Sequence, residues 1–206
     1  MSITRHILTA ALLAGAGHAV AASSVDLSVR GSITPSACEL DIANGGAFEL
    51  GKVSAKDLSP TSPTDLAEQT TGLAVTCEAA TLMAIESTDN RAGSAHWDEQ
   101  LNFGLGLING TQKLGGLHIA VRRQVADGEA VYGNHSLDGG KTWANNGLFR
   151  PGGLSSVYKV SPMAPIPVQV LTAQMTIYPT IARTQGLTLT DEVPIDGSVT
   201  LTMRYL

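Results

Sequence analysis

Apolar residues recur at every second position in short runs along most of this chain. An extended strand turns successive side chains to opposite faces, so such a run buries one face and exposes the other. The runs fall at 25–33, 73–77, 82–85, 103–107, 117–121, 168–178 and 199–205. The pattern predicts many short β-strands, with no sustained helical period and one short helical turn near Ser62 to Glu68.

Turn signals separate these runs. The chain has 22 glycines and 9 prolines, and clusters of Asn, Asp and Gly are typical of tight turns between antiparallel strands. They occur at 44–46, 109–110, 115–116, 127–128, 138–140, 145–147 and 196–197. The segment from Pro151 to Pro167 is rich in Gly, Ser and Pro, and we expect a long surface loop there. Many short antiparallel strands favour an all-β sandwich.

The first residues predict an export signal. Arg5 and His6 precede a short apolar run at 7–14, and small residues at 19–22 offer a cleavage site after Ala21, with Ala19 or Ala22 as neighbouring options. The apolar run is shorter than the roughly 20 residues that span a bilayer. We therefore expect residues 1–21 to be removed and the mature chain to be exported without being inserted in a membrane.

Length and charge limit the function of the mature chain. Removing 21 of 206 residues leaves 185 (206 − 21), which suits one domain. Arg5 is the one charged residue removed, so the formal charge changes from −5 to −6. Phosphate binding needs concentrated Lys and Arg, so an acidic chain without basic clusters is not expected to bind nucleic acid.

Two cysteines, Cys38 and Cys77, remain in the exported chain. In an oxidising compartment such a pair predicts a disulfide. The alternative is two buried thiols. Metal binding is disfavoured because the sequence has no C-x-x-C spacing and no histidines beside the cysteines.

The two ends of the mature chain carry the clearest alternation. Near the amino terminus one strand face is apolar or glycine and the other is polar; the first face holds Val25, Leu27, Val29, Gly31 and Ile33. At the carboxyl terminus the alternating apolar residues are Val199, Leu201, Met203 and the penultimate Tyr205, followed by Leu206. Each segment is either an ordinary strand of the protein's own sheet or a strand that engages another molecule.

These ends resemble those of the pilins assembled by the bacterial chaperone–usher pathway. Such pilins have a donor arm of alternating apolar residues around one glycine, with a cysteine seven residues after it, as Gly31 and Cys38 are placed here. They also end in an alternating strand with a penultimate aromatic residue, which here is Tyr205.

The resemblance implies an incomplete immunoglobulin-like β-sandwich that is completed by donor-strand exchange. Residues 22–37 would be the donor arm, and residues 38–206 would be the pilin-like domain. A periplasmic chaperone would engage the strand from Val199 to Leu206, and an outer-membrane usher would join neighbouring subunits into a fimbrium on the cell surface. No cofactor is implied.

The chain departs from the common pilin pattern in its middle. Many pilins have a glycine about fourteen residues from the end, where this chain has Val193, and its extra length lies between about Asn109 and Pro167. As a whole it resembles an uncharacterised family of fimbria-associated proteins more than a major shaft subunit. The resemblance therefore leaves open whether the subunit builds the shaft or sits at the tip.

The segment from Ser136 to Trp143 matches the Asp-box pattern S-x-D-x-G-x-T-W, which is known from sialidases. The motif is a structural hairpin there, and 185 residues cannot build the propeller that carries it, so we expect a hairpin and no glycan hydrolysis. Trp143 remains a candidate contact for a host glycan. A tip adhesin or lectin-like subunit that uses the middle insertion is therefore the alternative function.

Catalytic motifs are lacking in the sequence. His96, His118 and His135 are scattered without partners at ligand or triad spacing, and we expect each on the surface or in a loop. The sequence has no G-x-S-x-G, P-loop or H-E-x-x-H motif. We therefore expect no enzyme, no catalytic residue and no metal site, although a self-complete secreted sandwich with an activity of its own stays as a second alternative.

Overall fold

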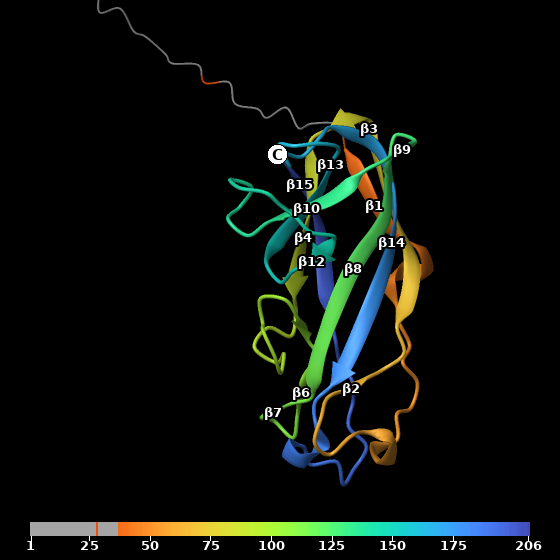
Figure 1. Ribbon diagram of the computed structural model, residues 1–206, viewed down its shortest axis with the longest axis vertical. Coiled ribbons are helices and arrows are strands. Elements are labelled where there is room, and N and C mark those ends of the chain that lie inside the picture. Colours follow the sequence, from red (N-terminus) through yellow and green to blue (C-terminus); the bar gives the residue numbers. More distant parts are fainter. Residues whose placement is uncertain (1–27, 29–36) are drawn as a thin grey trace, which may run out of the picture. The chain divides into compact units, whose positions relative to one another are not determined.

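Two antiparallel β-sheets pack face to face in the computed structural model, which describes Ser28 and residues 37–206 (Figure 1). The described residues from Ala37 to Leu206 belong to one compact unit. The expected export signal and the donor-arm residues Val25, Leu27, Val29, Gly31 and Ile33 lie outside the described residues.

The first sheet is built on three long strands. Its path is β1 (Cys38–Ile42), β3 (Gln69–Thr81), β14 (Val168–Ile181), β8 (Gly115–Ala126) and β12 (Leu148–Phe149). Three short strands pair at its margins: β2 (Thr64–Asp65), β5 (Phe103–Gly104) and β9 (Glu129–Ala130). In Figure 1 the long strands β8 and β14 run side by side along most of the molecule.

The second sheet has five strands. Their order is β11 (Ala144–Asn145), β10 (Tyr132–Ser136), β13 (Gly153–Tyr158), β4 (Met83–Asp89) and β15 (Val199–Tyr205). A separate hairpin joins β6 (Leu107–Ile108) to β7 (Gln112–Lys113). Its turn residues Asn109 and Gly110 have φ of 51° and 80°, so the Asn-Gly pair forms the predicted turn.

Helical structure in the described part of the chain is short. The 3-10 helices are η1 (Ala43–Gly46), η2 (Ala55–Asp57) and η3 (Thr184–Gly186). The helical turn expected near Ser62 to Glu68 is wrong, because that segment carries β2, which pairs with β14. Among the described residues, no helix reaches the length and hydropathy that a membrane crossing requires.

The alternating residues meet between the two sheets. Leu73, Val75 and Cys77 of β3 face Ile85 of β4 and Val157 of β13 in one cluster of buried side chains. The period of two in the sequence therefore forms one core, and the prediction of an all-β sandwich is confirmed.

The disulfide between Cys38 and Cys77 is present. The two residues are opposite each other in the β1–β3 register, with their Cα atoms 4.0 Å apart. Cys77 is buried in the core and Cys38 is the first residue of β1. The bond therefore fixes the start of an edge strand to a central strand.

The prediction of a surface loop from Pro151 to Pro167 is wrong for the first half of that segment. Residues 153–158 form β13, which lies between β10 and β4. The strand was not predicted because serines stand where apolar residues were expected. Their hydroxyls are satisfied by the backbone: Ser156 Oγ donates to the Met83 carbonyl at 2.7 Å. Small hydrogen-bonded side chains can thus be buried in a central strand, and the loop is confined to residues 159–167.

Replacing both Cys38 and Cys77 by alanine is expected to lower the free energy of unfolding by about 4 kcal/mol, because the bond closes a 39-residue separation in the unfolded chain. Urea unfolding of the oxidised protein and the variant measures the difference. Dithiothreitol serves as the control: it should destabilise the parent and leave the variant unchanged, and an equal effect on both would contradict the prediction.

Candidate functional site

Within residues 37–206 the sandwich is open along one side. β1 is the outermost strand of the first sheet and β15 the outermost strand of the second. β1 pairs with β3 and β15 pairs with β4, while no other strand of the described residues pairs with either. Two neighbouring edges therefore have backbone groups directed toward the gap between them.

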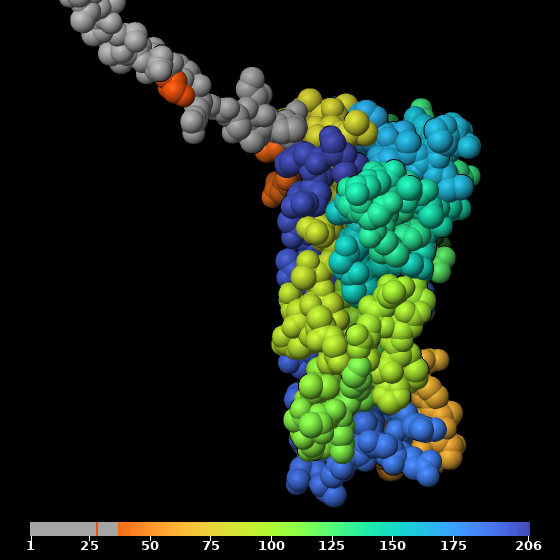
Figure 2. Space-filling view, turned by 90° about the vertical axis from the view of Figure 1, so that its left-hand side faces the viewer, coloured from red at the N-terminus to blue at the C-terminus, as the bar shows by residue number. Residues whose placement is uncertain are grey.

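An apolar groove follows this gap. It consists of two adjoining hollows of about 660 and 470 Å³, which share five lining residues. The shared residues are Gly46, Phe48, Leu117, Ile177 and Gly197. In Figure 2 residues of β1 (orange) and β15 (dark blue) lie together at the upper left of the molecule.

The side chains along both edges are only partly buried although they pack against the core. On the β1 side these are Leu40, Ile42 and Phe48; on the β15 side they are Val199, Leu201 and Met203. The polar residues between them, such as Thr200 and Thr202, point to solvent. The predicted alternation of the carboxyl-terminal strand thus places Val199 and Leu201 on the wall of the groove, while Met203 packs against the core beyond it.

The groove extends beyond the two strands. Residues 46–58 continue the β1 side, where the Gln69 side-chain amide donates to the Glu49 carbonyl at 2.8 Å. Residues 187–197 continue the β15 side and are held by the β6–β7 hairpin through Thr188, whose N–H donates to Gln112 Oε1 at 2.8 Å. These walls were not predicted from the sequence, although apolar residues at every second position mark them at 48–50 and, apart from Asp191, at 187–195.

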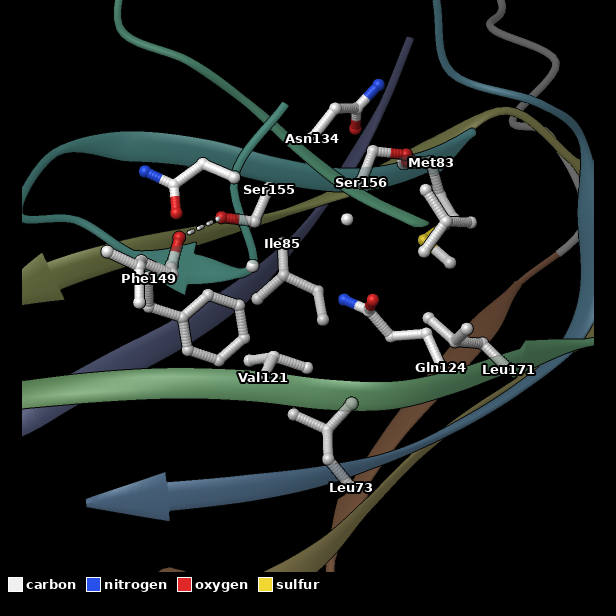
Figure 3. A pocket seen from close by; sticks show the side chains of 15 residues that line it. Leu73, Met83, Ile85, Val121, Gln124, Asn134, Phe149, Ser155, Ser156 and Leu171 are labelled. Atoms are coloured by element: carbon white, nitrogen blue, oxygen red, sulfur yellow. Dashed lines mark hydrogen bonds between the residues drawn. The ribbon is translucent and has the colours of Figure 1, made fainter. Parts of the chain in front are cut away.

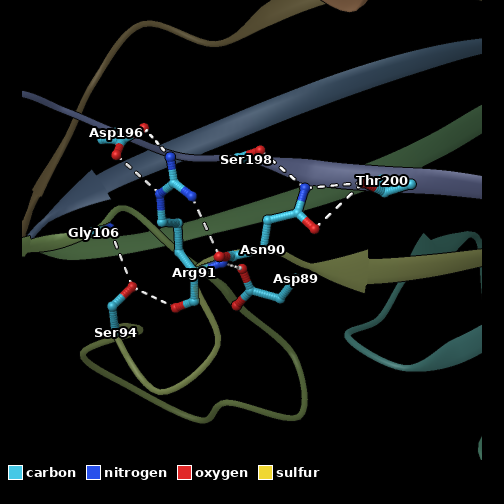
Figure 4. A network of polar contacts seen from close by, with 8 residues as sticks. All are labelled: Asp89, Asn90, Arg91, Ser94, Gly106, Asp196, Ser198 and Thr200. Atoms are coloured by element: carbon cyan, nitrogen blue, oxygen red, sulfur yellow. Dashed lines mark hydrogen bonds and ion pairs between the residues drawn. The ribbon is translucent and has the colours of Figure 1, made fainter.

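A polar network fixes the segment that leads into β15 (Figure 4). Arg91 donates through Nε and Nη2 to both carboxylate oxygens of Asp196, at 2.9 and 2.8 Å. Asn90 Nδ2 donates to Ser198 Oγ and Thr200 Oγ1 at 3.0 and 2.9 Å. The hydrogen bond and the charge of Arg91 lower the pKa of Asp196, so the carboxylate stays ionised. The network binds the β15 wall to the loop after β4.

Polar contacts also join the two sides of the groove. The backbone N–H of Cys38 donates to the hydroxyl of Tyr205 at 2.9 Å, which links the start of β1 to the end of β15. Lys52 and Glu192 form an ion pair of 3.1 Å between the other parts of the two walls. Both ionic side chains are more than 80% exposed, so this second contact is readily broken.

The Asp-box segment forms the predicted hairpin. Asp138 accepts hydrogen bonds from the hydroxyls of Ser136 and Thr142, each at 2.7 Å, and from the backbone N–H groups of Lys141 and Thr142. Hydrogen bonds, above all from the Thr142 hydroxyl, hold the pKa of Asp138 well below its usual value. The carboxylate therefore organises the turn.

Trp143 belongs to the same hairpin. Its indole N–H donates to the Gly140 carbonyl at 3.0 Å and its side chain is half-buried. The space beside Gly140 is bounded by Trp143, Leu154 and the terminal Leu206, so the hairpin packs near the end of β15. Since the indole donor is already used, this geometry favours a structural role for Trp143.

The prediction that all three histidines lie on the surface or in loops holds for one of them. His96 is exposed as expected, but His118 and His135 lie half-buried on β8 and β10. Burial is the largest cause that lowers the pKa of both, and nearby arginines add to it. In the described part of the chain, no three His, Cys, Asp or Glu side chains are grouped as metal ligands.

A further hollow lies inside the sandwich (Figure 3). Leu73 and Val121 of the first sheet and Ile85 of the second surround it, together with Phe149. Its volume of about 20 Å³ holds no more than about one water molecule, so it is a gap in the core packing and not a ligand site.

Comparison with known proteins gives two matches. Residues 27–116, fewer than half of the chain, match the family described as "Protein of unknown function (DUF1120)". Protein GltF of Escherichia coli (strain K12) is 26% identical over 251 residues, in an alignment that covers all of this chain and 98% of GltF. The chain is therefore similar to GltF over nearly the whole length of both proteins.

Replacing Asp138 by asparagine is expected to lower the melting temperature at pH 7, because the carboxylate accepts four hydrogen bonds in the fold. A carboxyl with a lowered pKa in the folded state stabilises it above the unfolded pKa of about 4, and this contribution is lost as the pH falls. The difference between parent and variant should therefore shrink below about pH 4.

Melting curves followed by circular dichroism from pH 7 to pH 2 measure this difference. Asp57→Asn is the matched control, since Asp57 is an exposed acid in a surface turn. A difference between parent and Asp138→Asn that stays constant over the whole range would show that the charge of Asp138 is not what stabilises the hairpin.

Proposed function

We propose that this protein is a structural subunit of a fimbrium, which polymerises by accepting a strand from a neighbouring copy. The observation that supports the proposal is the apolar groove between β1 and β15, two sheet edges that pair with no further strand of the described residues. Strand addition supplies partners for edge backbone groups and side chains for an apolar groove at the same time.

The segment before β1 has the pattern that such a groove requires. Residues 25–33 alternate, with apolar residues or glycine on one face and polar residues on the other. Nine extended residues span about 30 Å. We propose that Val25, Leu27, Val29 and Ile33 enter the groove of the next subunit and that Gly31 lies where a side chain would not fit.

Burial supplies much of the free energy of this contact. Four apolar side chains at about 1.5–3 kcal/mol each contribute on the order of 10 kcal/mol, before the backbone hydrogen bonds of the added strand. A contact of this strength can join subunits without covalent links. Because the arm of one copy enters the groove of another, the contact is head-to-tail and extends into a filament.

An open groove needs a temporary partner before assembly. Exposed apolar surface and unpaired strand edges promote aggregation. We propose that a periplasmic chaperone covers the groove by pairing along β15 to its end at Tyr205 and Leu206, and that an outer-membrane usher exchanges the chaperone for the arm of the next subunit. In this proposal the protein is exported to the cell surface and its role is structural, not enzymatic.

A peptide of residues 24–35 supplied to a variant that lacks its own arm is expected to fill the groove. At 100 times its dissociation constant a ligand adds about 2.7 kcal/mol of stability, which corresponds to a rise of about 5–10 °C in melting temperature for a domain of this size. Thermal unfolding with and without the peptide measures the shift.

A peptide with Gly31→Leu is the matched control, and it should give a much smaller shift because leucine replaces the residue for which no space is expected. The same substitution in the full-length chain should prevent fibres, as judged by electron microscopy. A variant without its arm that is stable and indifferent to both peptides would overturn the proposal.

A further inference from the structure

A second depression lies on the outer face of the first sheet, where β2, β8 and β14 meet. Its volume is about 500 Å³. The side chains that carry its chemistry are Asp65, Glu68, His118, Arg122, Tyr178 and Thr180. They come from three separate stretches of the chain, and only His118 was a candidate residue on the sequence alone.

The alternation of β14 separates the apolar lining of the groove from the polar side chains of this depression. Ile177 is buried and lines the groove, whereas the next residue, Tyr178, is half-buried on the opposite face. His118 pairs with Tyr178 across the β8–β14 register and shares its face. A substitution of Tyr178 or Arg122 therefore leaves the groove-lining side chains of these strands in place.

Two aromatic rings form the floor of the depression, and the residues next to them on the same face of the sheet are small. The rings of His118 and Tyr178 meet edge to face with centroids 6.0 Å apart. The next pair on the same face is Ala120 and Thr176, which are both small and buried, while the two rings are half-buried. Aromatic side chains presented in this way offer an apolar surface with a polar rim.

The rim carries both hydrogen-bond acceptors and a hydrogen-bond donor. On one side Asp65 accepts a hydrogen bond from the Thr180 hydroxyl at 2.8 Å and lies near Glu68. On the other side is Arg122, which forms no ion pair with any residue in 37–206 or with Ser28. Burial, with smaller effects from Arg122 and Arg150, lowers the pKa of His118 and so favours its neutral imidazole.

We propose that this depression binds a neutral saccharide. A sugar ring has an apolar face that can pack on Tyr178 and hydroxyls that can donate to Asp65 and Glu68 and accept from Arg122. The two carboxylates oppose an anionic ligand, and the charged rim opposes a wholly apolar one. The site is separate from Trp143 and does not require polymerisation.

The test is saturation-transfer NMR on the full-length exported protein. The probes are the methyl glycosides of glucose, galactose, mannose and N-acetylglucosamine, with sorbitol as a compound that lacks a sugar ring. At least one glycoside should receive saturation, and Arg122→Ala, which removes an exposed side chain, should weaken its binding about tenfold. Tyr178→Ala should abolish the transfer in a protein whose circular dichroism spectrum is unchanged.

Two control variants separate this site from other surfaces. Tyr132→Ala removes a tyrosine that is 62% exposed on the other sheet, and Thr172→Ala changes an exposed residue on the same strand outside the depression. Both should bind as the parent does. No transfer to any of the four glycosides, or equal transfer in the Arg122→Ala variant, would overturn the saccharide site without bearing on strand exchange.

Discussion

The structure depends on two sheet edges, β1 and β15, that lie close together and pair with no further strand among residues 37–206, so their outward backbone N–H and C=O groups need partners. β1 is fixed to β3 by the Cys38–Cys77 bond, and the approach to β15 is fixed to the loop after β4 by Arg91 and Asp196. These anchors belong to opposite walls of the groove. Both walls are therefore held in place by contacts of this chain itself. In the proposed strand exchange, ordering would be needed in the added strand and not in the walls.

The groove explains why apolar residues near both chain ends are only partly buried. A core side chain normally contacts the opposite sheet, but Leu40 and Leu201 lie on the outermost strands of the two sheets and line the groove between them. In the proposed fibre a neighbour's strand would cover them. In that proposal the same alternation that builds the core also specifies the contact between subunits.

The same alternation of side chains places a different set of residues, polar and aromatic, on the outer face of the first sheet. Its half-buried Tyr178 and His118 lie among polar groups, one residue away from groove-lining side chains. A strand with two such faces can serve assembly on one side and recognition on the other. The Asp-box hairpin, in contrast, uses Asp138 and the indole of Trp143 within its own turn.

The sequence by itself determined the all-β class, the disulfide, the Asn109–Gly110 turn and the alternation of Val199 to Met203, because these depend on local periodicity or on a single cysteine pair. The tertiary structure decided which strands became edges, and so where the groove runs. It also placed the serine-rich β13 in a central position, where hydroxyl–backbone bonds replace apolar side chains. Asp65, Arg122 and Tyr178 come together only because β2 and β8 both pair with β14, and a local sequence pattern does not reveal pairing between strands so distant in the chain.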